Sequence, residues 1–234
     1  MTTFRLPLSL RADAVELLDS GQLTPREIER NLADLARLNR LPGGTRASAA
    51  GIRRLLAGRR SARVLDVGTG RGDVPIAFAR RGWDTTAVDT HPEVVKIARS
   101  QMDGEPGIQV MQADAGALPF EDGTFDVSHC SLLVHHLDPD AVVSMLREMR
   151  RVARLGVVIN DLRRGLLPLV STAASVIAIG GSRVTRTDGL TSARRAYTLD
   201  ELDRMVDDAG LAVRWRSPRW MPRVVTATTP VPAR

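Results

Sequence analysis

A glycine-rich turn after an apolar, strand-like run is the stretch of this sequence best suited to bind a small ligand. Residues 64–67 have strand character and include one acid, Asp66, and Gly68, Gly70 and Gly72 follow at alternate positions. A helical pattern begins directly afterwards. A strand that turns on glycines into a helix N-terminus brings backbone N–H groups close to a ligand. The stretch therefore predicts a ligand-binding turn, and the alternative is a tight turn that binds nothing.

The spacing of these glycines argues against a dinucleotide as the ligand. A dinucleotide fingerprint needs its third glycine at position 73, where this sequence has Asp73. Asp66 lies two positions before Gly68. An acid there suits a ligand with a positive group and would repel a diphosphate.

Two further acids follow the next strand-like runs. Asp89 comes after residues 84–88, and Asp114 with Ala115 comes after residues 108–111. In an open parallel sheet, ligands bind at the carboxyl ends of the strands. Asp89 is suited to accept hydrogen bonds from two ribose hydroxyls, and Asp114 from an exocyclic amine of adenine. Each acid taken alone has another explanation, as a helix cap or a turn residue.

The elements that must position these residues alternate along the chain from residue 62 onwards. The patterns predict strands at 63–67, 84–88, 108–111, 125–130, 155–160, 211–216 and 224–228, and helices at 74–81, 92–102, 139–152 and 199–209. Alternating units of this length imply a parallel sheet with helices on both faces. We therefore predict an α/β fold with a Rossmann-like, seven-stranded, mostly parallel sheet.

Two segments lie outside this alternation. Residues 1–60 read as an N-terminal helical cap, with a short amphipathic piece at 13–18, a helix at 25–39 begun by Thr24 and Glu27, and a helix at 46–56. Residues 162–198, within the main domain 61–234, are predicted to form a substrate lid. This lid starts with an apolar helix, and a glycine- and arginine-containing run follows at 180–189.

Together these motifs resemble the class I methyltransferases that use S-adenosylmethionine. Residues 64–72 resemble the first motif of that family, Ala87-Val88-Asp89 its ribose-binding acid, and residues 113–115, 118–120 and 125–127 the run into the fourth strand. The resemblance is close over residues 62–161 and loose elsewhere. It implies S-adenosylmethionine as the cofactor, whose sulfonium and amino groups would account for Asp66. A family member that has lost catalysis is the remaining alternative.

The resemblance also gives a set of expected cofactor-binding residues. They are Asp66, Gly68, Thr69, Gly70, Gly72, Asp89, Thr90, Asp114, Ala115, Cys130 and Arg40.

Candidate catalytic residues follow the fourth and fifth strands. Methyl transfer needs a base only if the nucleophile must lose a proton. His135 and His136 fit this role because histidine titrates near neutral pH, and His136 is slightly preferred. Asp161 is expected to orient one histidine or to contact the substrate. The alternative for all three residues is loop packing and capping.

The lid is expected to select the methyl acceptor. Leu166 and Val170 belong to an apolar wall suited to an aromatic or lipid-like acceptor, while Arg183, Arg186 and Tyr197 are expected to contact an acidic or phenolic group. The apolar helix has a second interpretation, as the interface of a homodimer. The acids at the strand ends form no obvious trio, so no metal site is expected.

A weaker resemblance concerns the acceptor itself. Residues 39–44, 160–164 and 182–189 resemble a bacterial subgroup that often belongs to polyketide and phenolic-lipid pathways. This favours O-methylation of a phenol or quinol in secondary metabolism. C-methylation of a similar ring, an RNA or protein methyltransferase, and a non-catalytic cofactor-binding partner stay open. The amine-directed motif Asn/Asp-Pro-Pro-Tyr/Phe/Trp is absent after the fourth strand, which disfavours methylation of nucleobase nitrogens.

The amino-acid composition limits the classes of binding partner that we expect. The net charge of +6 would suit an anionic partner, but Lys96 is the only lysine and the arginines are scattered. Aromatic residues make up only 3%, too few for base-stacking platforms, so we expect no nucleic-acid partner. The single cysteine excludes an intrachain disulfide. The start lacks the pattern of a signal peptide, and residues 166–180 are too short and too interrupted to span a membrane, so we expect a cytoplasmic protein.

Overall fold

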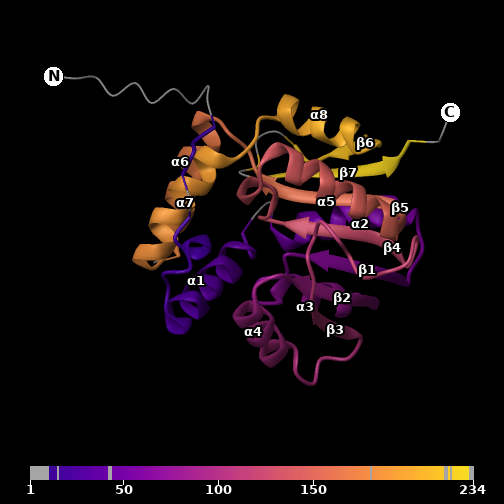
Figure 1. The fold of residues 1–234 in the computed structure, drawn as a ribbon, viewed down its shortest axis with the longest axis horizontal. Helices are drawn as coiled ribbons and strands as arrows, with labels where there is room; N and C mark the ends of the chain where they lie inside the picture. Colours follow the sequence, from indigo (N-terminus) through magenta and orange to yellow (C-terminus); the bar gives the residue numbers. More distant parts are fainter. Residues whose placement is uncertain are drawn as a thin grey trace.

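Seven strands, formed by the described residues, make one sheet with the order β3-β2-β1-β4-β5-β7-β6 (Figure 1). The computed structural model describes residues 11–14, 16–41, 44–179, 181–218, 221 and 223–231. The strands are β1 (Ala62–Val67), β2 (Trp83–Asp89), β3 (Ile108–Gln112), β4 (Phe125–Ser131), β5 (Ala153–Leu162), β6 (Leu211–Arg216) and β7 (Arg223–Pro230). All neighbours pair in parallel except β7, which runs antiparallel to β5 and to β6. The predicted fold class is confirmed.

The order of the strands reverses between β1 and β4. The chain proceeds from β1 outward to β3, then returns to place β4 on the other side of β1. At such a switch point the two crossover connections leave in opposite directions, and a crevice opens at the carboxyl ends of the strands. The glycine turn after β1 lies at this position.

Helices cover both faces of the sheet and also its ligand-binding end. They are α1 (Pro25–Leu38), α2 (Thr45–Leu56), α3 (Asp73–Ala79), α4 (Pro92–Met102), α5 (Pro139–Val152), α6 (Leu166–Ala178), α7 (Arg183–Arg195) and α8 (Leu199–Asp208), with short 3₁₀ turns η1 (Leu18–Ser20) and η2 (Val134–His136). Prolines begin α1, α4 and α5, where a missing N–H costs no hydrogen bond. Capping boxes begin α1 and α8, and the box at Thr24 and Glu27 is the one that the sequence predicts.

Alternate side chains of the strands build two cores, one on each face. On one face Met145, Leu146 and Met149 of α5 pack with α8 against Leu65 and other strand residues. On the opposite face Ile52 and Leu56 of α2 pack with Phe78 of α3 against the same strands. Helix α2 therefore belongs to the layer that covers the sheet, although it precedes the first strand in the sequence.

Helices α1, α6 and α7 lie beyond the carboxyl ends of the parallel strands (Figure 1). Helices α6 and α7 pack against each other, and α1 packs against α7. The sequence predicts α6 as an apolar helix but does not predict α7, whose residues are polar and include Gly189. Ser182 begins α7, because its side chain accepts a hydrogen bond from the backbone N–H of Thr185. No helix formed by the described residues is long and apolar enough to cross a membrane.

The predicted amphipathic piece at 13–18 is not a helix. Its described residues have no helical turn before η1, and their polar groups bond to α7 instead. Ala12 N–H donates to Arg194 O at 3.2 Å, and Leu17 N–H donates to Asp188 Oδ1 at 2.9 Å. A six-residue segment gains too few internal hydrogen bonds to offset helix nucleation, so contacts with a distant helix decide its conformation.

Candidate functional site

The glycine turn follows β1 and precedes α3. Gly68, Gly70 and Gly72 have φ angles of 70°, 54° and 94°, which lie in the left-handed region that glycine adopts most readily. The N–H groups of Gly68 and Thr69 both donate to Val88 O, at 2.9 and 3.0 Å, which ties the turn to β2. A Cβ atom on Gly72 would lie 2.7 Å from Met102 Cε. The turn is therefore held close to its neighbours and is specific for glycine.

Asp89 closes the turn from the end of β2. Its Oδ2 accepts a hydrogen bond from Gly70 N–H at 3.2 Å, and its Oδ1 accepts one from His91 N–H at 3.1 Å. Burial raises the pKa of the Asp89 carboxyl, and the two backbone N–H groups offset only part of that rise. The carboxylate retains lone pairs that can accept hydrogen bonds from a ligand.

Asp66 lies at the end of β1 in a chain of buried hydrogen bonds. Its Oδ1 is 2.6 Å from Nδ1 of His129, and Nε2 of His129 is 2.8 Å from Ser48 Oγ. Asn160 Nδ2 donates to the same Ser48 hydroxyl at 2.8 Å. The imidazole therefore uses both of its ring nitrogens, one toward Asp66 and one toward Ser48. Asp66 is therefore fixed by side chains of β4 and α2. The residues next to Asp66 in the sequence do not indicate these contacts.

A pocket opens over these residues. It is lined by the turn residues Gly68, Thr69, Gly70 and Arg71, by Asp66, Asp73, Asp89, Thr90 and His91, by residues 131–133, and by apolar side chains of α1 and α4 such as Ile28, Leu32 and Val94. Thr69 Oγ1 and Ser131 Oγ are buried, and no described residue forms a hydrogen bond with either atom. Buried polar atoms without partners at a pocket wall are sites where a ligand can complete the hydrogen bonding.

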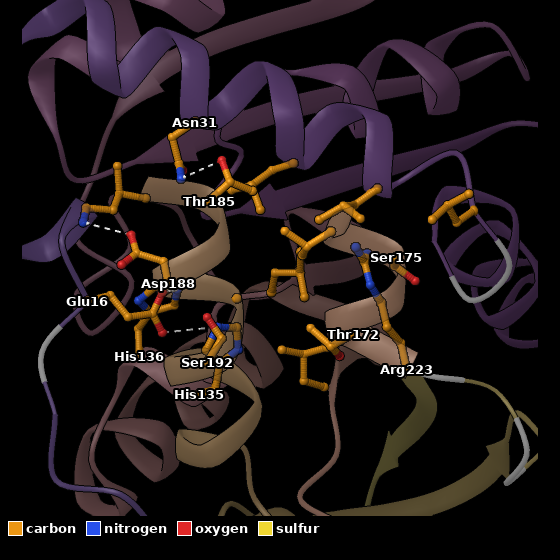
Figure 2. A pocket seen from close by; sticks show the side chains of 18 residues that line it. Glu16, Asn31, His135, His136, Thr172, Ser175, Thr185, Asp188, Ser192 and Arg223 are labelled. Atoms are coloured by element: carbon orange, nitrogen blue, oxygen red, sulfur yellow. Dashed lines mark hydrogen bonds and ion pairs between the residues drawn. The ribbon is translucent and has the colours of Figure 1, made fainter. Parts of the chain in front are cut away.

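A second pocket lies beneath α6 and α7 (Figure 2). Its apolar wall contains Leu18, Leu35, Leu38, Leu41, Leu132, Leu162 and Val176, and its polar wall contains Glu16, Asn31, His135, His136, Thr172, Ser175, Thr185, Asp188, Ser192 and Arg223. Leu18, Leu35, Leu132 and His136 also line the first pocket. The two pockets therefore share a wall, and a ligand in one pocket can contact a ligand in the other.

A histidine pair occupies one end of this second pocket, and Arg223 lies at the other end beside Ser175 (Figure 2). His135 Nδ1 is 2.5 Å from Asp161 Oδ1, and the backbone N–H groups of Val134 and Leu162 donate to Asp161 at 2.7 and 2.6 Å. Burial acts to raise the pKa of Asp161, but the His135 imidazole and these hydrogen bonds lower it by more, so the pKa is below its ordinary value. Asp161 therefore acts as an ionised partner that orients His135.

Comparison with known proteins identifies the type of domain. A family model described as "Methyltransferase domain" matches residues 64–156, which hold the glycine turn, Asp89, most of strand β1 and the strands β2 to β4. Residues 64–156 therefore match a methyltransferase domain. Domains of this type use S-adenosylmethionine as their cofactor, and the turn, the acid Asp66 and the unpartnered Thr69 hydroxyl fit a ligand with a positive end and hydroxyl groups.

Three relatives illustrate the extent of the match. The ubiquinone biosynthesis O-methyltransferase of Xylella fastidiosa is 44% identical over 87 residues, which are 35% of this chain and 35% of that protein. A SAM-dependent methyltransferase from Aquifex aeolicus is 21% identical with a TM-score of 0.62, covering 89% of this chain and 100% of that one. The magnesium protoporphyrin IX methyltransferase from Synechocystis, solved with bound SAH, is 16% identical with a TM-score of 0.58, covering 80% and 84%. The chain spans about a third of the length of the first curated relatives it matches.

Six of the predicted cofactor-binding residues line the first pocket: Asp66, Gly68, Thr69, Gly70, Asp89 and Thr90. Gly72 is buried at the start of α3 and shapes the turn without lining the pocket. The other four lie elsewhere: Asp114 and Ala115 in the turn after β3, Cys130 fully buried in the core, and Arg40 exposed after α1. Burial also raises the pKa of the Cys130 thiol well above its ordinary value, which agrees with a structural role.

The predicted acceptor-binding residues do not line the second pocket. Leu166 and Val170 are 68% and 56% exposed, because they lie on the side of α6 that faces away from it. Arg183 and Arg186 are exposed on α7, and the Tyr197 hydroxyl donates to Leu137 O at 2.7 Å. The residues that α6 and α7 contribute instead are Thr172, Ser175, Val176, Thr185, Asp188, Gly189 and Ser192.

Three residues at the site have no predicted role in the sequence analysis. Glu16 is 3% exposed and meets the histidine pair from the N-terminal segment. Asn39 donates to Asp73 Oδ2 at 2.9 Å, and Arg223 donates to Asn39 Oδ1 at 2.5 Å. Burial lowers the pKa of Arg223 to about 10, so the guanidinium is still charged at neutral pH. Of these three residues only Asn39 carries a sequence signal, since it ends a predicted helix and begins the run 39–44 that resembles the bacterial subgroup.

Proposed function

We propose that this methyltransferase transfers the methyl group of S-adenosylmethionine to an oxygen of a small, largely apolar acceptor, such as a phenol or a quinol. The observation that carries the proposal is the second pocket, whose exposed lining surface is mostly apolar and which ends on the oriented His135 beside the cofactor pocket. The name of the Xylella fastidiosa relative, an O-methyltransferase of ubiquinone biosynthesis, supports an acceptor of this type.

Bound S-adenosylmethionine supplies a methyl group on a positively charged sulfur, which is a good electrophile. The remaining requirements are alignment of the acceptor oxygen, exclusion of water and removal of the hydroxyl proton. The leucines of α1 with Leu132 and Val176 provide an apolar enclosure for a ring. Such an enclosure holds the acceptor against the shared wall and keeps water away from it.

His135 is the residue that we assign as general base. The hydrogen bond from Nδ1 to Asp161 leaves Nε2 as the nitrogen that accepts the hydroxyl proton. The new bond joins the acceptor oxygen to the methyl carbon, the bond between that carbon and sulfur breaks with its electron pair on sulfur, and the proton stays on His135 until it exchanges with water. His136 lines both pockets, so its role is to position the acceptor at their junction.

A screen with mass spectrometry tests the proposal. The protein is incubated with S-adenosylmethionine and a panel of phenols and quinols, and each product is examined for a gain of one methyl group. Fragmentation that locates the methyl on oxygen supports the proposal, and a methyl on ring carbon would favour C-methylation instead. Calorimetric titration with S-adenosylmethionine is the prior test, because absence of binding would remove the enzymatic proposal. Activity only on RNA or protein, lost in high salt, would contradict the choice of acceptor.

A variant with alanine at His135 tests the base. General base catalysis contributes about 10²- to 10⁴-fold to a rate. We expect kcat of the variant His135→Ala to fall by about that factor at neutral pH, and the deficit to shrink as pH rises towards about 10, where a phenol ionises without help. A deficit that is equal at every pH would show that His135 acts on something other than the proton.

A further inference from the structure

Three side chains with metal-ligating atoms meet at one end of the second pocket. Glu16 comes from the N-terminal segment, and His135 and His136 come from η2 (Figure 2). Each can offer one ligand atom, and these atoms all lie within 4.8 Å of one another. Glu16 lies far from the strand ends in the sequence, so the expectation of no metal site, which rests on the strand-end acids, does not include it.

The environment of the Glu16 carboxylate would favour a bound cation. The residue is 3% exposed, and no described residue donates a hydrogen bond to its buried Oε1. Burial of a carboxylate is costly unless the group is paired with a charge or coordinates a metal ion. The Nε2 atoms of the two imidazoles lie 3.7 Å from Oε1 and Oε2 respectively, beyond hydrogen-bonding distance.

His135 has the outer contact that is typical of a metal-bound histidine. Metal-ligating histidines usually donate the N–H of their other ring nitrogen to a carboxylate or a carbonyl. His135 Nδ1 makes such a contact with Asp161 at 2.5 Å, and its Nε2 faces Glu16. The histidine ring is therefore already held in the tautomer and orientation that expose Nε2 as a ligand.

The distances are close to those of a tetrahedral site. Zinc–nitrogen and zinc–oxygen bonds of about 2.0–2.1 Å place neighbouring ligands about 3.3 Å apart in a tetrahedron. His135 Nε2 lies 3.7 Å from Glu16 Oε1 and His136 Nε2 lies 3.7 Å from Glu16 Oε2, and one ligand atom from each residue lies within 4.8 Å of the others. The three side chains therefore surround one position but must move closer together to hold an ion.

We propose that Glu16, His135 and His136 bind one divalent transition-metal ion, with Zn²⁺ as the best match. Two histidines and one carboxylate are a known three-residue ligand set for zinc, with the fourth position left to water or a substrate. The fourth position faces the second pocket, where water or an oxygen of the acceptor completes the tetrahedron. The binding of the ion requires neither the cofactor nor an acceptor.

One consequence rests on the proposed function. A nitrogen bound to a metal ion has no lone pair left for a proton, so the ion and the acceptor's proton compete for His135 Nε2. The metal-loaded methyltransferase therefore lacks its base, and Zn²⁺ inhibits methyl transfer over the same concentration range in which it binds.

Binding is tested on the full chain after its purification tag has been removed and the protein has been dialysed against a chelator. Calorimetric titration with ZnCl₂ is expected to give one site, and Co²⁺ is expected to give the intense visible bands of a tetrahedral complex. Glu16→Gln and His136→Ala should each lower the Zn²⁺ affinity at least about tenfold, because even second-shell changes cost that much. Glu29→Gln, an exposed glutamate on α1, is the matched control and should bind as the wild type does.

Circular dichroism establishes that each variant is folded before it is titrated. Absence of a stoichiometric site in the wild type, or an affinity in Glu16→Gln equal to that in Glu29→Gln, would overturn the proposed site. Once an acceptor is known, inhibition that follows the binding curve supports the competition for His135. Activity that rises on loading would leave the metal site standing and refute the assignment of His135 as base, so the two proposals fail separately.

Discussion

Replacement of His129 with phenylalanine tests whether buried hydrogen bonds hold Asp66 in the cofactor pocket. His129 is fully buried on β4 and bridges the Asp66 carboxylate at 2.6 Å and the Ser48 hydroxyl at 2.8 Å. A phenylalanine ring has a similar shape and keeps the edge-to-face contact with Phe78, whose ring centroid is 5.1 Å away. The substitution therefore removes the two nitrogen contacts and little else.

The expected loss of stability follows from what the substitution leaves behind. Two ordinary hydrogen bonds would account for about 2 kcal/mol. Asp66 is only 2% exposed, however, and a buried charge that loses its partner costs about 3–5 kcal/mol. We expect the larger value in the unfolding free energy of His129→Phe. For a chain of this size, this corresponds to a fall in melting temperature of roughly 6–20 °C.

Urea unfolding without cofactor measures the effect, and two further variants isolate its cause. Ser128→Ala, on the neighbouring residue of β4, removes one buried hydrogen bond to Met149 O and should cost about 1 kcal/mol. Asp66→Asn added to His129→Phe removes the uncompensated charge and should recover part of the loss. Calorimetry should show weaker S-adenosylmethionine binding by His129→Phe and unchanged binding by Ser128→Ala. If His129→Phe costs no more than Ser128→Ala, the Asp66 carboxylate does not depend on this histidine.

Three further predictions concern other parts of the site. Gly72→Ala should destabilise the protein more than Gly82→Ala in urea unfolding. Both glycines have positive φ, at 94° and 81°, but only at Gly72 would a Cβ atom meet Met102 Cε, at 2.7 Å. Equal losses of stability in the two variants would contradict the close packing at Gly72. S-adenosylmethionine affinity should fall as pH is lowered through the pKa of Asp89, which burial raises, because protonation removes a charged acceptor. The variant Asp89→Asn should bind the cofactor about 10- to 100-fold more weakly and without this pH dependence. A wild-type pH profile in that variant would exclude Asp89 as the titrating group. Asp34→Ala should raise the KM for the acceptor and leave the cofactor affinity unchanged. Asp34 accepts hydrogen bonds from Ser182 N–H and the Thr185 hydroxyl, both at 2.8 Å, and so fixes the start of α7. An unchanged KM would argue against α7 as part of the acceptor pocket.

The parts of the fold that the sequence predicts are those decided by short-range patterns. Strand β1 is followed by Gly68, β2 ends in Asp89, and the helices α4 and α5 begin with proline, so these bounds follow from residues close by in the sequence. The same holds for the cofactor side of the site, since Gly68, Gly70 and Asp89 belong to two neighbouring βα units. Strands at a switch point bring their carboxyl ends together whatever else the chain contains.

The acceptor side depends on contacts between distant segments, and there the sequence is a poor guide. Helix α6 is apolar around most of its circumference, so periodicity does not distinguish the inward Thr172 and Val176 from the outward Leu166 and Val170. Helix α7 has few apolar residues and is held instead by Asp34 of α1. Glu16 reaches the histidines only because its backbone neighbours bond to α7.

The backbone of η2 shows how these distant contacts converge on one imidazole. His135 O accepts hydrogen bonds from Arg11 Nη2 at 3.0 Å and from Arg195 Nε at 3.1 Å, while the side chain of the same residue is held by Asp161. The N-terminal segment, α7 and β5 therefore all fix His135, from three sides. A ring constrained in this way loses little entropy when it meets a substrate, which is the condition for efficient proton transfer. It follows that substitutions in the N-terminal segment should affect the rate of proton removal as well as the binding of the acceptor.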